Sequence, residues 1–156
     1  MWWQTDGGKT WTKVYEGDGT VYPNGIHCAS ELHCVAAFEG ESARILVARD
    51  GGKTWKETMH DTDHASSLVA VHMLSETEGW VSGGHMDMAD FEGRYWHTLD
   101  GGDTWAKEAI KNLYIFSFDM LSKKSGFSVA LTIQSGVQLL KYRDNATLVT
   151  LKRGAA

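Results

Sequence analysis

The chain has 156 residues, which is enough for one domain with a hydrophobic core. Its net charge of −5 argues against a nucleic-acid-binding protein, and no apolar run is long enough to predict a membrane span. The first residues lack a basic segment followed by an apolar one, so we expect no signal peptide in this sequence. Its 17 glycines, 7 tryptophans and single proline are typical of an all-β protein with many tight turns.

The first strands are expected within residues 1–16, on either side of the hexapeptide Asp6-Gly7-Gly8-Lys9-Thr10-Trp11. Glycines accept the positive φ of a tight turn, and the aspartate can accept hydrogen bonds from backbone N–H groups inside it. The tryptophan then begins the next strand as a large apolar side chain. We therefore predict a structural role for this aspartate, not a catalytic one. Residues 17–25 follow as a glycine-rich connection without a strand pattern.

The next unit is predicted to begin with strands at Ile26–Ser30 and His33–Phe38. Cys28 and Cys34 lie on either side of the short polar link between these strands. The pair is either a disulfide across one hairpin or two buried thiols. We expect the disulfide, which would indicate an oxidising or extracytoplasmic compartment.

Short apolar runs bounded by turn residues continue at regular spacing to the end of the chain. The remaining predicted strands are Ala43–Ala48 and Thr54–Thr58 in this unit, Leu68–Leu74, Gly79–Gly83, Arg94–Leu99 and Thr104–Ala109 in the third, and Ile115–Leu121, Gly126–Thr132, Val137–Tyr142 and Thr147–Lys152 in the fourth. The hexapeptide recurs at residues 50–55 and 100–105, and a shorter version begins at Asp144. No segment has a sustained helical period.

The copies start 44, 50 and again 44 residues apart, and such a period is typical of stacked repeat units. Their pattern resembles the Asp-box, or bacterial neuraminidase repeat, of β-propeller proteins. The resemblance implies that the structural positions are Asp6, Gly8, Thr10, Trp11, Asp50, Gly52, Thr54, Trp55, Asp100, Gly102, Thr104 and Trp105. We expect the tryptophans at 55 and 105 to be buried.

The sequence thus predicts one all-β domain, an Asp-box propeller or partial propeller of about 3.5 four-stranded blades. The expected half blade covers residues 1–16, and the full blades cover about 25–58, 67–109 and 114–152. Closed propellers typically have about 4–8 blades, so we expect part of a larger propeller. An open arc supported by other contacts is the alternative.

Two unusual loops are expected side by side on the face opposite the Asp-boxes. They cover residues 59–66 and 84–93 and are rich in His, Asp and Met. Imidazoles and carboxylates can bind zinc, but the spacing matches no established site, so we predict no metal and no cofactor. Exposed Met and Phe suit a protein interface. The candidate partner-binding residues are His60, His64, His85, Met86, Met88 and Phe91.

Within the Asp-box proteins, the phrase Gly79-Trp80-Val81-Ser82-Gly83 and the boxes themselves look most like the photosystem II assembly and stability factors. This resemblance implies a non-enzymatic scaffold that binds protein partners, such as subunits of a photosynthetic membrane complex. It also implies a plastid or thylakoid-lumen (chloroplast) setting.

The alternative is a glycan-binding or glycoside-hydrolysing, sialidase-like propeller. Sialidase chemistry needs an arginine cluster and a tyrosine nucleophile. Arg44 and Arg94 both begin a third strand, and Tyr22 and Tyr95 are candidate tyrosines. The Arg-Ile-Pro signature is absent, however, and we expect the two arginines to pair with local carboxylates such as Glu41 and Glu92. We therefore predict no enzyme activity and no catalytic residue.

Overall fold

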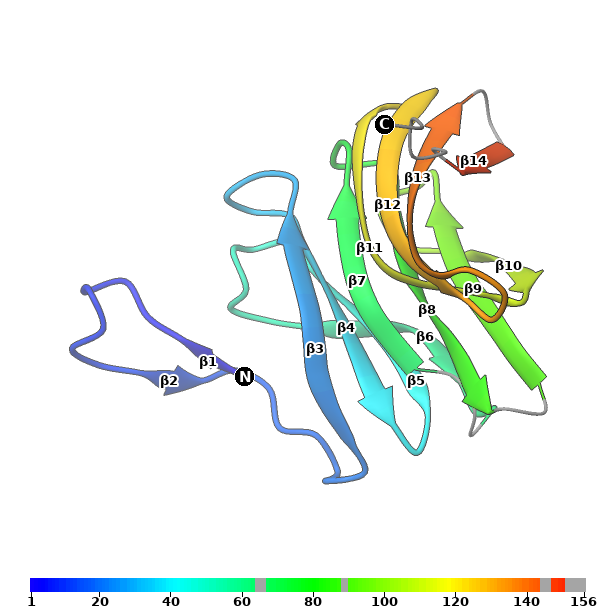
Figure 1. The fold of residues 1–156 in the computed structure, drawn as a ribbon. Coiled ribbons are helices and arrows are strands. Elements are labelled where there is room, and N and C mark those ends of the chain that lie inside the picture. Colours follow the sequence, from blue (N-terminus) through cyan, green and yellow to red (C-terminus); the bar gives the residue numbers. More distant parts are fainter. Residues whose placement is uncertain (64–66, 88–89, 144–146, 151–156) are drawn as a thin grey trace.

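The computed structural model describes residues 1–63, 67–87, 90–143 and 147–150, with the backbone alone at 86, 87, 90, 142, 143 and 147–150. The strands of this described part form one two-stranded and three four-stranded antiparallel sheets (Figure 1). Blade A is β1 (Trp2–Trp3) and β2 (Thr12–Lys13); blade B is β3 (Val21–Cys28), β4 (Cys34–Gly40), β5 (Ala43–Ala48) and β6 (Lys56–Asp61). Blade C is β7 (Ser67–Met73), β8 (Gly79–Asp87), β9 (Asp90–Thr98) and β10 (Ala106–Lys111). Blade D is β11 (Leu113–Ser122), β12 (Ser125–Thr132), β13 (Gly136–Arg143) and β14 (Thr147–Thr150).

Each full blade is a meander in chain order, and the blades follow one another side by side (Figure 1). The first strands of blades B, C and D contact one another along the inner side of the arc. The turns between strands one and two and between strands three and four share one face, which we call the box face. The inter-blade connections and the turns between strands two and three share the other, which we call the connection face. The half blade and three four-stranded blades are those that the sequence predicts.

The start of blade B differs from the prediction. Residues 17–25 were expected to lack strand structure, but β3 already begins at Val21. A β-bulge between Pro23 and Gly25 accommodates the proline in this edge strand. Proline is tolerated at edges and bulges because its missing N–H costs no ladder hydrogen bond there.

The second Asp-box shows how the motif closes its turn. The Asp50 carboxylate accepts hydrogen bonds from the Thr54 backbone N–H at 3.0 Å and from its hydroxyl at 2.6 Å. Trp55 Nε1 donates to the Gly52 carbonyl at 3.0 Å. Gly51 and Gly52 have φ of 74° and 82°, which other residues rarely adopt. The first and third boxes repeat these bonds, and in all three the bond from the Thr hydroxyl lowers the pKa of the aspartate.

The second and third boxes also dock on the blade that precedes them. Trp105 Nε1 donates to Thr58 Oγ1 in blade B at 3.1 Å, and a Cβ added at Gly102 would lie 2.8 Å from Val47. Trp3 Nε1 of blade A likewise donates to the Gly51 carbonyl at 2.9 Å. The prediction that the tryptophans at 55 and 105 are buried is therefore only partly correct, because both are half-buried between blades. Trp11, for which no burial was predicted, is 56% exposed.

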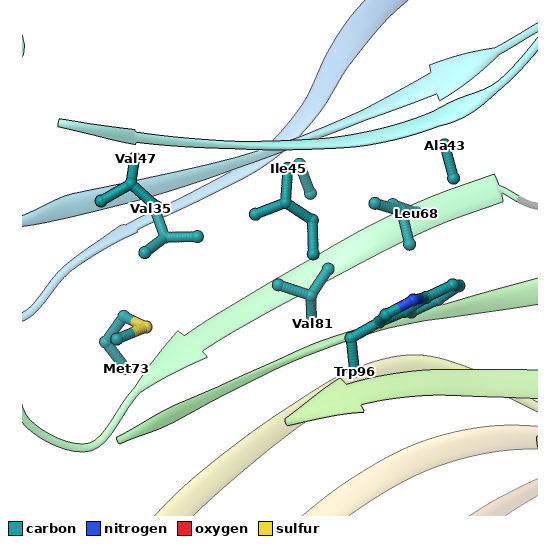
Figure 2. Close-up of a cluster of buried hydrophobic side chains, with 9 residues drawn as sticks. Val35, Ala43, Ile45, Val47, Leu68, Met73, Val81 and Trp96 are labelled. Atoms are coloured by element: carbon teal, nitrogen blue, oxygen red, sulfur yellow. The ribbon is translucent and has the colours of Figure 1, made fainter. Parts of the chain in front are cut away.

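The largest core lies between blades B and C (Figure 2). Figure 2 shows aliphatic side chains of blade B facing those of blade C across the gap between the sheets. The buried members are Val35, Ala37, Ala43, Ile45 and Val47 from blade B, and Leu68, Met73, Val81 and Trp96 from blade C. Strand alternation explains the division, because the intervening residues Ala36, Phe38 and Leu46 pack toward blade A instead. Burial of both sheet faces therefore joins the blades.

A disulfide joins Cys28 and Cys34, which are directly opposite each other at the end of the β3–β4 hairpin, with Cα atoms 4.0 Å apart. The same register position in the other full blades holds a methionine paired with a glycine: Met73 with Gly79, and Met120 with Gly126. A Cβ added at Gly79 would lie 2.2 Å from Met73 Sδ, so the thioether fills the space of a second side chain. The disulfide in blade B and the Met–Gly pairs in blades C and D thus fill the equivalent position in different ways.

This equivalence predicts which replacement the disulfide tolerates. Changing Cys28→Ala with Cys34→Ala should lower the free energy of unfolding by about 2 kcal/mol, the chain-entropy value for so short a loop. Changing Cys28→Met with Cys34→Gly should recover at least half of that loss, because the methionine then packs over the glycine as in blades C and D. Urea denaturation of the three proteins measures both differences. Equal stability of the two double variants would contradict the equivalence.

Candidate protein-binding face

Arg94 ties the two predicted loops together on the connection face. Its Nη1 bonds the Asp63 carboxylate, in the connection from blade B to blade C, at 2.6 Å. Its Nε bonds Glu92, in the β8–β9 hairpin, at 2.9 Å. The Arg94 side chain is 9% exposed, and although burial opposes its charge, the two carboxylates raise its pKa overall. One buried cation therefore fixes both loops on the same face, side by side.

Further ion pairs hold the first loop. Lys107 Nζ of blade C bonds the Asp61 carboxylate at 2.6 Å. His60 Nδ1 lies 3.3 Å from Glu57, and its side chain is 40% exposed. The loop is thus anchored at its acidic residues and presents a histidine to solvent.

The second predicted loop is largely strand, because β8 extends to Asp87 and β9 already begins at Asp90. This end of the β8–β9 hairpin is backed by aromatic rings from blade D. Phe91 packs against Tyr114 with ring centroids 6.3 Å apart, and Tyr114 against Phe116 at 5.1 Å. The Tyr114 hydroxyl and Ser67 Oγ lie 2.7 Å apart, joining the first strands of blades C and D. Tyr114 is buried, which raises its pKa, whereas Phe116 is 38% exposed at a β-bulge.

The candidate residues therefore fall into different environments. His60 is exposed, and His85 and Phe91 are half-buried. His64 and Met88 lie outside the described residues, and of Met86 only the backbone is described. Sequence reasoning missed Phe116, because a single aromatic residue in a predicted strand does not reveal that a bulge turns it outward.

Arg44 forms a second clamp, equivalent to that of Arg94. It bonds Asp18, in the connection from blade A to blade B, at 2.7 Å, and lies 3.8 Å from Glu57. The bond to Asp18 raises the pKa of Arg44, and the pKa of Asp18 is lowered, chiefly by the Thr20 hydroxyl. Both arginines thus neutralise carboxylates of their own chain. Arg94 pairs with Glu92 as expected, whereas the carboxylates paired with Arg44 are Asp18 and Glu57 rather than the expected Glu41.

The two candidate tyrosines also have carboxylate partners. The Tyr22 hydroxyl donates to Glu39 at 2.8 Å, and this bond raises the pKa of the phenol. The Tyr95 hydroxyl donates to Glu108 in the same way. A raised pKa disfavours the phenolate, whereas a nucleophile is activated by a lowered pKa or by a base that takes its proton in the reaction.

Metal-binding geometry is not found in the described part of the chain, where no three His, Cys, Asp or Glu side chains are grouped to hold an ion. The same residues include no helix that could cross a membrane.

The sequence matches no protein-family model and no curated protein. The fold matches a solved structure described as "YCF48 bound to D1 peptide", with a TM-score of 0.66 and 20% sequence identity. The match covers 87% of this chain and 42% of that chain, so this chain spans less than half of that protein's length. The chain therefore has the fold of a partial β-propeller of the YCF48 kind.

Proposed function

We propose that this chain is a non-enzymatic propeller scaffold whose connection face binds a protein partner. The observation that carries the proposal is the Arg94 clamp, which joins Asp63 of the first predicted loop to Glu92 of the β8–β9 hairpin on one face. Preorganised loops bind with less loss of conformational entropy than mobile ones. The likeness in fold to YCF48, a protein with a structure bound to a D1 peptide, supports a peptide or protein as the ligand.

The more specific role that we propose is an assembly or stability subunit of a photosystem complex in the thylakoid lumen. It is supported by the sequence resemblance and by the Cys28–Cys34 disulfide, because such bonds persist in oxidising compartments. The sialidase-like alternative has less support. Arg44 and Arg94 are each neutralised by carboxylates, which leaves them poorly suited to binding the carboxylate of a substrate.

The proposal predicts binding of a D1 peptide through the connection face. We expect the double variant His60→Ser with His85→Ser to weaken that binding at least about tenfold, as for side chains at the centre of an interface. The matched control is Leu32→Ser with Lys124→Ser, which changes two exposed residues in the turns of the box face. Isothermal titration calorimetry of the three proteins with the peptide measures the difference.

Arg94→Gln tests the positioning step separately. Losing the cation should free the connection at residues 59–63 from the β8–β9 hairpin and weaken peptide binding by a similar factor, although the Arg94 side chain itself is buried. If the box-face variant weakens binding of a D1 peptide as much as the connection-face variant does, the connection face is not the binding interface. No binding at all would refute the D1-like partner, and turnover of a sialoside that Arg44→Ala abolishes would establish the enzymatic alternative.

A further inference from the structure

The inner strands of blades B, C and D place three polar side chains in one row near the box face. His27, His72 and Asp119 each directly precede the first member of a matching cross-strand pair, which is Cys28–Cys34, Met73–Gly79 or Met120–Gly126, so they occupy equivalent register positions. Because β3, β7 and β11 contact one another, the row crosses both blade interfaces. The sequence alone gives no sign of it, since the three residues lie 45 and 47 positions apart.

The contact between blades B and C requires an uncharged histidine. The rings of His27 and His72 stack with centroids 4.9 Å apart and an interplanar angle of 19°. The Met73 backbone N–H donates to His27 Nδ1 at 3.1 Å. That nitrogen must be unprotonated to accept the bond, so His27 is the neutral tautomer with its proton on Nε2. A second proton would convert the acceptor into a donor facing another donor.

The contact between blades C and D involves the same stack. His72 Nε2 lies 3.1 Å from the Met120 carbonyl, which is the shorter of its two contacts with that residue and assigns the ring proton to Nε2. His72 Nδ1 lies 3.4 Å from Asp119, whose side chain is largely exposed. The ring of Phe118 covers the stack at 6.2 Å. His72 is therefore largely buried between two blades.

We propose that the His27–His72 stack is a pH-sensitive joint, which holds blades B and C together at neutral pH and loosens at mildly acidic pH. The ionisable groups facing His72 are His27 from β3 and Asp119 from β11, while its partner on β8 is the uncharged Trp80. His27 faces His72 from β7 and is paired with Val35 on β4. Asp119 is the one carboxylate of this row, so it can compensate for a charge on His72 but not for charges on both rings.

The direction of the pH effect follows from the protonation form of His72 that the folded and the unfolded chain each prefer. Burial lowers the pKa of His72 below its ordinary value of 6.5, and the neighbouring His27 lowers it further, while Asp119 acts in the opposite direction. The folded chain thus binds this proton less tightly than the unfolded chain. The stabilisation is complete above pH 6.5 and is lost as the pH falls from there through the folded-state pKa.

Amide hydrogen exchange at Met73 reports the joint directly, because its N–H is the group bound by His27. After correction for intrinsic exchange, we expect its protection to fall several-fold between about pH 7.5 and about pH 5.5, with a ceiling of about tenfold for one histidine. The double variant His27→Asn with His72→Asn keeps an acceptor oxygen near the position of His27 Nδ1, but neither residue titrates, so the protection of Met73 should change less than about twofold with pH. His60→Asn, on the opposite face, is the matched control and should behave as the wild type.

Unchanged Met73 protection in the wild type, or a loss that persists in the double variant, would overturn the proposal. If the double variant does not fold, an NMR titration of the wild type decides the question. The Met73 amide shift should then follow the same midpoint as the His27 ring carbons, and a separate midpoint would refute the joint.

Discussion

Trp96→Ala is expected to lower the free energy of unfolding by about 3–5 kcal/mol, the range for removing a buried aromatic side chain. Trp96 is 2% exposed and packs from β9 into the core between blades B and C (Figure 2). The side chains that it meets come from both blades, so the resulting cavity weakens the interface as well as one sheet. Urea denaturation followed by far-UV circular dichroism measures the change.

The matched control is Trp11→Ala, which removes the same side chain from a site that is 56% exposed. Surface substitutions usually change stability by no more than about 0.5 kcal/mol. If both variants lower the free energy of unfolding by similar amounts, the main hydrophobic core does not lie around Trp96 between blades B and C.

Gly83→Ala is expected to lower the free energy of unfolding by about 3 kcal/mol, the upper end of the usual range for overpacking. A Cβ at Gly83 would lie 1.8 Å from the Ser67 carbonyl oxygen and 2.9 Å from Leu68 Cα. These are backbone atoms of the paired strand β7, next to a β-bulge, so they cannot move aside as a flexible side chain would. The strand pair itself must shift.

Gly17→Ala provides the control for this prediction. Its added Cβ would meet nothing closer than 3.8 Å, and its backbone does not have a positive φ. We expect a change of no more than about 0.5 kcal/mol. A tolerated Gly83→Ala in thermal denaturation would contradict the close approach of β7 and β8.

The repeated Asp-box made the blades predictable from sequence, because each turn is closed by bonds within six residues. Asp50 and Thr54 bind each other wherever the turn is placed, so the motif is visible locally. The burial of the box tryptophans was harder to predict. It depends on the preceding blade, as the contact of Trp105 with Thr58 shows.

The candidate face was predictable only in outline. Strand order places the loops at 59–66 and 84–93 on one side, but the residue that joins them is Arg94, which bonds Asp63 from 31 positions away. Nothing in the sequence connects those two residues. The Arg44 clamp with Asp18 spans 26 positions and is equally hidden. Such pairs form because the connection entering a blade passes over the start of its third strand.

The most direct test of the binding face is hydrogen exchange of the whole chain with and without a D1 peptide. We expect added protection on the connection face, at residues 59–63, 84–87 and 90–93. We expect no change at the Asp-box turns, residues 50–55 and 100–105, on the opposite face. Protection confined to those turns, with the connection face unaffected, would contradict binding at the connection face.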